Sequence, residues 1–191
     1  MDADLTDAEA LVRSVDDPRW FAIVYRRHLP AVARYLTRRV GRAAAEDLTA
    51  ELFLRAFHRR ADYQPRYATA LPWLMGIASK LISEHRRYER RRLDALARLM
   101  SVPSEYGHAP DRGLAPELIA AVRKLSHPDR DTLLLVVWGE LSYEETAFAL
   151  GVAVGTVRSR VARARRRLAE AFDAPTTPSH TRREGGAYAR G

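Results

Sequence analysis

The sequence predicts an all-α protein made of two small helical units that are joined by a linker. Apolar residues recur at helical spacing along most of the chain, and no segment shows a convincing strand-like alternation. Helix-start signals recur as well, because Thr6–Glu9 and Ser142–Glu145 both have the hydroxyl-to-carboxylate spacing of a capping box. The helical periodicity is interrupted once within the chain, which indicates two units rather than one.

The interruption and the two ends of the periodic pattern divide the chain into four parts. We predict a first helical unit over residues 8–92 and a second over residues 116–172. Residues 93–115 contain several Ser, Pro and Gly residues and are predicted to form a flexible linker. Residues 173–191 are polar and contain repeated Gly and Pro, so they are predicted to be a disordered tail.

The chain is strongly basic and contains no cysteine. Its 32 Lys and Arg residues outnumber 24 Asp and Glu residues, which gives a formal net charge of +8. This excess favours a polyanionic partner, either nucleic acid or an anionic membrane surface. The lack of Cys fits a reducing compartment, and no run approaches the roughly 20 apolar residues that cross a bilayer. We therefore expect a soluble cytoplasmic protein with no membrane partner.

No pattern in the sequence indicates catalysis, a metal or a cofactor. There is no phosphate-binding glycine loop and no pair of carboxylates at a defined catalytic spacing. The six His residues lack the spacing of metal ligands, and Cys-ligated zinc is excluded. We therefore predict a binding protein that is not an enzyme, with no catalytic residue, metal or cofactor.

A helix predicted over residues 47–60 is apolar on more than one side. Leu48 and Leu52 form one apolar side, and Phe53, Leu54 and Phe57 form the other. One interpretation is that the helix is simply buried all round. The other is that the Leu48/Leu52 side, flanked by the charged residues Glu51 and Arg55, docks on another protein.

The segment from Leu71 onward predicts a helix with one buried face and a cationic outer face. Lys80, Arg86 and Arg87 belong to the expected cationic face, which continues through residues 90–92. Aromatic residues in or beside the preceding loop could stack on unpaired bases next to these cations. They are Tyr63, Tyr67 and Trp73. A Trp at such a position is nevertheless more often part of a core than a stacking platform.

The strongest local pattern is a helix-turn-helix over residues 142–167. Ser142 begins a short helix and Gly151 ends it, because a glycine adopts the left-handed conformation of a helix C-terminus without strain. The following helix carries an apolar stripe at helical spacing, formed by Val157, Val161, Ala164 and Leu168.

The side of this second helix that is opposite to the stripe is rich in arginine. At about 100° per residue, Ser159, Ala162, Arg163 and Arg166 point away from the stripe. A narrow apolar seam with a guanidinium-rich outer face suits a helix that enters the major groove of DNA. A solvated basic helix in an ordinary bundle is the alternative. Only Glu170 is expected nearby as an acidic partner, so the arginine charge is predicted to stay largely unneutralised.

Three segments, in this order, resemble the extracytoplasmic-function group of bacterial sigma factors. Residues 46–57 are similar to the polymerase-binding helix of that family, and residues 71–92 are similar to its promoter-melting segment. Residues 141–165 are similar to its C-terminal helix-turn-helix. The sequence departs from the family at Lys80, where Asn is common, and at Ala162, where the family often has a larger side chain. The small Ala162 therefore implies a different −35 preference.

The resemblance implies a factor that joins core RNA polymerase and directs promoter-specific initiation, with a stand-alone helix-turn-helix regulator as the alternative. Polymerase binding would involve Asp47, Leu48, Glu51, Leu52 and Arg55. Binding and melting of the −10 element would involve Tyr63, Trp73, Lys80, Arg86 and Arg87. The −35 element would be read through Thr156, Arg158, Ser159, Arg160, Arg163 and Arg166. An anti-sigma protein is a further partner that the family implies, although no residue pattern identifies one.

Overall fold

The computed structural model describes residues 5–100 and 116–173, and within these ranges it contains helices and no strand. This confirms the all-α prediction. The first unit comprises α1 (Asp7–Asp16), η1 (Pro18–Trp20), α2 (Phe21–Val40), α3 (Arg42–His58), η2 (Arg60–Asp62) and α4 (Leu71–Met100). The second unit comprises α5 (Pro116–Lys124), α6 (His127–Val137), α7 (Tyr143–Leu150) and α8 (Val154–Asp173).

The predicted capping signals form as expected. The Glu9 amide donates to the Thr6 hydroxyl at 3.2 Å, and the Thr6 amide donates to the Glu9 carboxylate at 2.8 Å. The same pair of bonds joins Ser142 and Glu145 at the start of α7. Gly151 ends α7 with φ of 65°, the left-handed conformation that a residue with a side chain adopts less easily.

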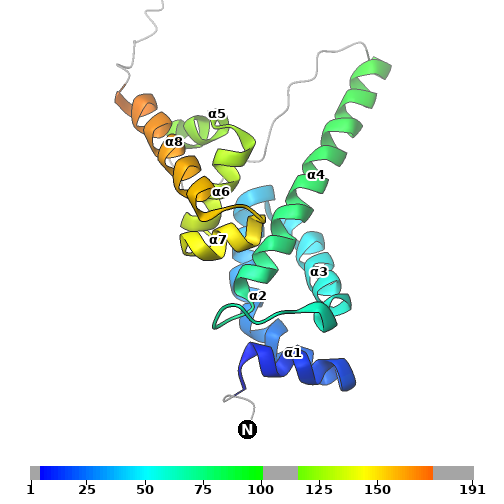
Figure 1. Ribbon diagram of the computed structural model, residues 1–191. Helices are drawn as coiled ribbons and strands as arrows, with labels where there is room; N and C mark the ends of the chain where they lie inside the picture. The colour runs from blue at the N-terminus through cyan, green and yellow to red at the C-terminus, as the bar shows by residue number, and fades with distance from the viewer. Residues whose placement is uncertain (1–4, 101–115, 174–191) are drawn as a thin grey trace, which may run out of the picture.

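The core of the first unit lies between α2, α3 and α4. Tyr35 and Leu36 of α2, Leu52 of α3 and Leu74 of α4 are completely buried there. Helix α4 continues to Met100 and projects away from the rest of the first unit (Figure 1). The predicted linker start at residue 93 is therefore wrong, because residues 91–100 are good helix formers without Gly or Pro. The remainder of the predicted linker, residues 101–115, lies outside the described residues.

The second unit is held together by the apolar stripe that the sequence indicated on α8. Val157, Val161 and Ala164 are buried against α6 and α7, and Leu168 packs at the edge of the same cluster. Helix α8 extends through Asp173, which the sequence assigned to the tail. Residues 174–191, the rest of the predicted tail, lie outside the described residues.

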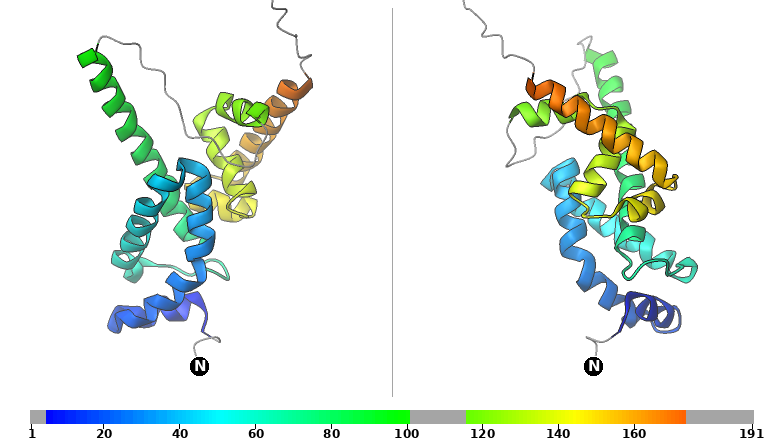
Figure 2. Two further views of the ribbon diagram at one scale, coloured as in Figure 1. Left: turned by 180° about the vertical axis from the view of Figure 1, so that it is seen from behind. Right: turned by 60° about the vertical axis from the view of Figure 1, so that its left-hand side comes forward.

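The two units pack against each other, and the main contact is between α4 and α7 (Figures 1 and 2). Leu135 and Leu141 of the second unit are buried in the same cluster as the core of the first unit. The approach of α7 to α4 is close, since a Cβ added at Gly76 would lie 2.9 Å from the carbonyl oxygen of Ala149. The sequence predicted two tethered units, and the contact between them was not foreseen.

Candidate nucleic-acid interface

The outer side of α8 exposes most of the arginine residues that the sequence selected. Arg158 and Arg166 have side chains that are 65% and 69% exposed, and the Arg163 side chain is 44% exposed. Ser159 and Ala162 are exposed between them, whereas Thr156 and Arg160 are half-buried. The Ser159 hydroxyl donates to the carbonyl of Thr156 at 3.0 Å, within the first turns of the helix.

Three of these arginines have carboxylate neighbours, which corrects the expectation that Glu170 alone would be close. Arg163 donates to Asp129 of α6 at 2.9 Å. Arg158 lies 3.7 Å from Glu144 of α7, and Arg166 lies 3.7 Å from Glu170. The two pairs at 3.7 Å are exposed and contribute little. The Asp129 carboxylate is 6% exposed, so Arg163 is the one of the three arginines that is paired with a buried carboxylate.

Burial would raise the pKa of Asp129, but hydrogen bonds from Arg163 and Ser126 outweigh it and keep that pKa below its ordinary value. The carboxylate is therefore charged at neutral pH and holds the Arg163 guanidinium against α6. Spacing along α8 could not reveal this pair, because Asp129 belongs to a different helix 34 residues earlier.

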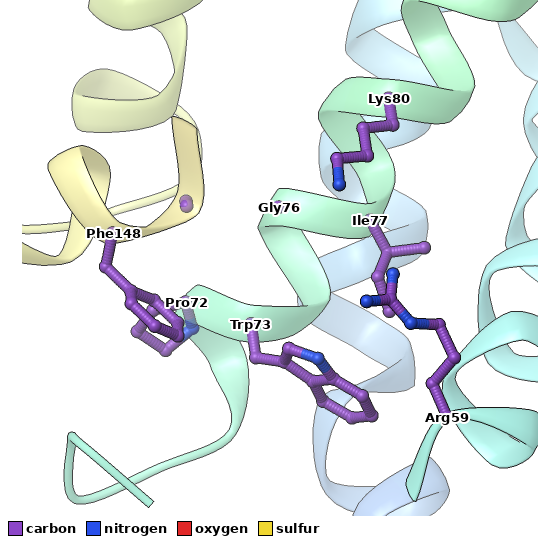
Figure 3. A pocket seen from close by; sticks show the side chains of 8 residues that line it. Arg59, Pro72, Trp73, Gly76, Ile77, Lys80 and Phe148 are labelled. Carbon is purple, nitrogen blue, oxygen red and sulfur yellow. The ribbon is translucent and has the colours of Figure 1, made fainter. Parts of the chain in front are cut away.

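A small hollow lies beside the start of α4. It has a volume of about 120 Å³ and is lined by residues of α4, α7 and the end of α3, namely Arg59, Pro72, Trp73, Gly76, Ile77, Lys80, Phe148 and Ala149. Figure 3 shows Phe148 of α7 beside Pro72, with Trp73, Lys80 and Arg59 from the first unit around the hollow. Trp73 also packs against Tyr63, with ring centroids 5.1 Å apart. Aromatic and cationic groups thus meet at one place on the first unit.

The loop that leads from Tyr63 to α4, which carries Trp73, is fixed to α1 through Asp7. The Asp7 carboxylate accepts a hydrogen bond from the Ala70 amide at 2.7 Å, lies 2.5 Å from Nε2 of His28, and pairs with Arg27. Burial would raise the pKa of Asp7, but the bonds from His28, Ala70 and Arg27 lower it to about 2. Asp7 therefore holds the residue that precedes α4 and, with it, the orientation of Trp73.

Arg86 does not belong to the exposed cationic face, which corrects the sequence-based assignment. Its side chain is 13% exposed and donates to Asp131 of α6 at 3.2 Å. Arg86 lies one turn beyond buried Ile82, so it points toward the same side of α4, whereas Lys80 and Arg87 are exposed. Burial, together with the nearby Arg39 guanidinium, lowers the pKa of Arg86 to about 10, so it remains charged at neutral pH.

Helix α3 buries residues from both of its predicted apolar sides, namely Leu52 and Phe53. Leu52 is fully buried in the core, whereas Leu54 is 52% exposed. Asp47 is exposed, and Leu48 and Glu51 are half-buried. Arg55 donates to Glu51 at 2.6 Å and pairs with Glu84 of α4 at 2.9 Å. The proposed Leu48/Leu52 face is therefore not exposed as a unit, because Leu52 packs inward with Phe53 and Ala56.

Comparisons with known proteins fit this geometry. Residues 24–92 match the Sigma-70 region 2 family, and residues 116–168 match the Sigma-70 region 4 family. The RNA polymerase sigma factor CarQ of Myxococcus xanthus is 33% identical over 155 residues, which cover 78% of this chain and 87% of that protein. The sigma factor EcfG of Rhodopseudomonas palustris is 38% identical over 65% of this chain and 68% of its own length. The chain belongs to the extracytoplasmic-function sigma factors.

Other proteins match this chain over a smaller share of their own length or at lower sequence identity. SigE of Mycolicibacterium smegmatis is 37% identical, and the match covers 79% of this chain but 60% of that protein. The chain thus spans about 60% of the length of the first curated relatives that it matches. CnrH in complex with the cytosolic domain of CnrY superposes with a TM-score of 0.65 at 23% identity, covering 89% of this chain and 99% of CnrH. The sigma factor RpoE of Bartonella quintana, in complex with the anti-sigma factor NepR, superposes with a TM-score of 0.57 at 26% identity. The match covers 84% of this chain and 98% of RpoE.

Region 2 of this sigma factor lies in the first unit and region 4 lies in the second. The residues that join the two regions were not predicted from the sequence. Arg39 of α2 and Arg86 of α4 both bond to Asp131 of α6, across 92 and 45 residues of sequence. Phe148 was not singled out either, because in the sequence it reads as one more apolar residue of a short helix. No local pattern could have found these residues, since their partners are distant along the chain.

Two other properties hold for the part of the chain that the structure describes. Over residues 5–100 and 116–173, no helix is both long enough and apolar enough to cross a lipid bilayer. In the same residues, no group of three or more His, Asp or Glu side chains is arranged to hold a metal ion.

Proposed function

We propose that this sigma factor binds core RNA polymerase and directs promoter-specific initiation of transcription. Regions 2 and 4 occur in one chain, and each has a cationic surface suited to DNA. The observation that carries the proposal is the α8 helix, whose buried apolar stripe leaves Arg158 and Arg166 exposed beside small Ser159 and Ala162. Such a helix fits the major groove, where arginine forks pair with guanine or grip phosphates.

The −35 element is read, in this proposal, by the outer side of α8. Arg163 and its neighbours contact base edges or phosphates once the Arg163–Asp129 pair opens, and the exposed small residues allow close approach of the helix. These contacts are carried by Thr156, Arg158, Ser159, Arg160, Arg163 and Arg166. Of these residues, half-buried Thr156 near the start of α8 suits a phosphate contact.

The −10 element is melted at the start of α4. Tyr63 and Trp73 provide aromatic surface beside the hollow, and Lys80 and Arg87 provide exposed charge. Unpaired bases stack on such aromatic rings while cations bind the backbone. Arg86 contributes only when it is released from Asp131.

Core polymerase binds the side of α3 that remains accessible, through Asp47, Leu48, Glu51 and Arg55. Exposed Leu54 extends this surface, whereas Leu52 supports it from the core. The protein itself makes and breaks no bond, because it supplies binding energy and positioning while the polymerase supplies catalysis. The sigma factor RpoE of Bartonella quintana was solved in complex with the anti-sigma factor NepR. We therefore include such a protein among the partners.

In vitro transcription tests the proposal directly. Core polymerase with this protein should start transcripts at defined positions on the native upstream region, and core polymerase alone should not. The variant Arg158→Ala, made in the full chain, tests the role of α8 in the same assay. It removes an exposed guanidinium of α8 and leaves the buried apolar stripe intact. A free protein that dimerises, binds an operator tightly in gel shifts and yields no transcript would instead identify a stand-alone regulator.

A further inference from the structure

Three buried arginines meet at one place between region 2 and region 4. Arg39 of α2, Arg86 of α4 and Arg130 of α6 form this arginine cluster. The side chains of Arg39 and Arg86 are 2% and 13% exposed, and Arg130 is 7% exposed. Asp131 accepts hydrogen bonds from Arg39 and Arg86 through the same oxygen atom, Oδ1. Among these four residues, three positive charges therefore face one negative charge.

Each guanidinium group of the arginine cluster also has a buried donor without a partner. The Nε atoms of Arg39, Arg86 and Arg130 are buried and make no hydrogen bond to any residue that the structure describes. The terminal nitrogens of two of the groups are paired, since Arg39 donates to the Tyr35 hydroxyl at 2.7 Å and Arg130 lies 2.6 Å from Nδ1 of His127. A buried charged donor that stays unpaired is costly, and an ion is one of the partners that resolve such a cost.

The pKa shifts within the cluster show which charges the carboxylate compensates. Burial would lower the pKa of Arg39, but Tyr35 and Asp131 outweigh burial and raise it. Burial and the like charges of Arg39 and Arg130 lower the pKa of Arg86 to about 10. Burial likewise lowers the pKa of Arg130, and Asp131 only partly opposes this effect. Asp131 therefore compensates Arg39, whereas the charges of Arg86 and Arg130 remain less well compensated.

The cluster reaches solvent on one side. The Asp131 side chain is 29% exposed, and His127 at the start of α6 is exposed as well. Arg130 lies in the first turn of α6 (His127–Val137), where the helix dipole favours a negative charge. An anion can therefore reach Arg86 and Arg130 from the solvent side, next to Asp131.

We propose that Arg86 and Arg130 bind a small oxyanion of the phosphate class, either inorganic phosphate or the phosphate group of a nucleotide. Planar guanidinium groups hold such anions through paired N–H donors, and the excess of arginine over carboxylate leaves room for a second negative charge beside Asp131. The anion joins Asp131 in the cluster and does not replace it. Because Arg86 belongs to region 2 and Arg130 to region 4, the anion bridges the two regions. The site is separate from the promoter contacts of the proposed function, since binding of a small anion needs neither DNA nor polymerase.

Isothermal titration calorimetry on the full chain tests the site, with potassium phosphate as the probe. We expect one phosphate to bind per chain, and potassium chloride of the same ionic strength should not abolish this binding, because buried charges are screened little by salt. Adenosine triphosphate is titrated in a second arm. Tighter binding of the triphosphate than of phosphate would identify a nucleotide as the source of the anion, and equal or weaker binding would identify free phosphate.

Two pairs of variants distinguish the arginine cluster from the exposed arginines of the chain. Arg86→Gln removes a guanidinium of the cluster, and Arg87→Gln removes the same charge from its exposed neighbour on α4. Arg130→Gln and Arg166→Gln form the second pair, because Arg166 is an exposed arginine of α8. We expect Arg86→Gln and Arg130→Gln each to weaken phosphate binding by at least about tenfold. The two exposed variants should change it by less than about twofold.

Equal phosphate affinity within both pairs of variants would show that the anion binds exposed arginines at large, and it would overturn the inference. Loss of phosphate binding in potassium chloride of the same ionic strength would overturn it as well. If one cluster variant loses its helical circular dichroism, the other pair decides alone. These titrations contain no polymerase, so a negative result leaves promoter-specific initiation standing, and a failure to direct transcription leaves the anion site standing.

Discussion

The carboxylate of Asp7 joins three parts of region 2. The substitution Asp7→Asn replaces this charged group with a neutral amide. Asp7 is 1% exposed and contacts His28, the Ala70 amide and Arg27. Its pKa falls from the ordinary value of 3.8 to about 2 in the folded protein. Because one pKa unit corresponds to about 1.36 kcal/mol, ionised Asp7 contributes roughly 2 kcal/mol to the free energy of unfolding.

The pH range of this contribution follows from the lowered pKa. The stabilisation is fully present above the unfolded pKa near 4, and it is lost as the pH falls toward the folded pKa of about 2. Asp7→Asn should therefore lower the unfolding free energy by at least roughly 2 kcal/mol at pH 7, since it also leaves Arg27 without its partner. The deficit relative to wild type should shrink between about pH 4 and pH 2.

Urea unfolding followed by circular dichroism measures both effects. Asp16→Asn is the control, because Asp16 is an exposed carboxylate of the same helix. Equal unfolding free energies for the two variants at pH 7 would refute the assignment of Asp7 as the anchor of the loop. So would a deficit for Asp7→Asn that stays constant down to pH 3.

Three further predictions follow from the placement of individual side chains. Arg163→Ala should weaken promoter binding by about 1–3 kcal/mol and relax one −35 position in a binding-site selection, whereas an equal loss on every sequence would assign Arg163 to a phosphate. If region 4 neutralises about five phosphates, the logarithm of its DNA affinity should fall with the logarithm of salt concentration at a slope of roughly −4 to −5, and a flat dependence would show that the arginines are only solvated. Leu52→Ala should destabilise the protein by about 2–5 kcal/mol because Leu52 is fully buried, and Leu54→Ala should cost less than about 0.5 kcal/mol. Thermal unfolding of the last two variants distinguishes core from surface on α3.

Features that are encoded over a few residues could be predicted from the sequence. The capping box at Ser142 and the stripe of Val157 and Val161 depend on spacings of three or four residues, and the structure reproduces them. Helix α3 could not be oriented in the same way. It is apolar all round, so periodicity cannot decide that Leu52 faces inward and Leu54 outward.

Contacts between distant segments could not be predicted, because they depend on how complete helices pack. The pairing of Asp131 with Arg39 and Arg86 and the packing of Phe148 against Tyr67 both arise only when region 4 lies on region 2. For the same reason the sequence placed Arg86 on an open cationic face. A single charged residue within an arginine-rich run carries no local sign that a carboxylate 45 residues later will cover it.

Asp129 and Asp131 pair with arginines of the two proposed DNA surfaces separately, although only one residue lies between them. At about 100° per residue they point to nearly opposite sides of α6. Asp129 holds Arg163 within region 4, whereas Asp131 holds Arg39 and Arg86 of region 2. Because they share no partner, Asp129→Asn should strengthen −35 binding and Asp131→Asn should strengthen single-strand binding, with additive free energies in the double variant. Coupling above about 0.5 kcal/mol in a double-mutant cycle would show that opening the contact between the regions also frees Arg163, so that one conformational change would control both surfaces.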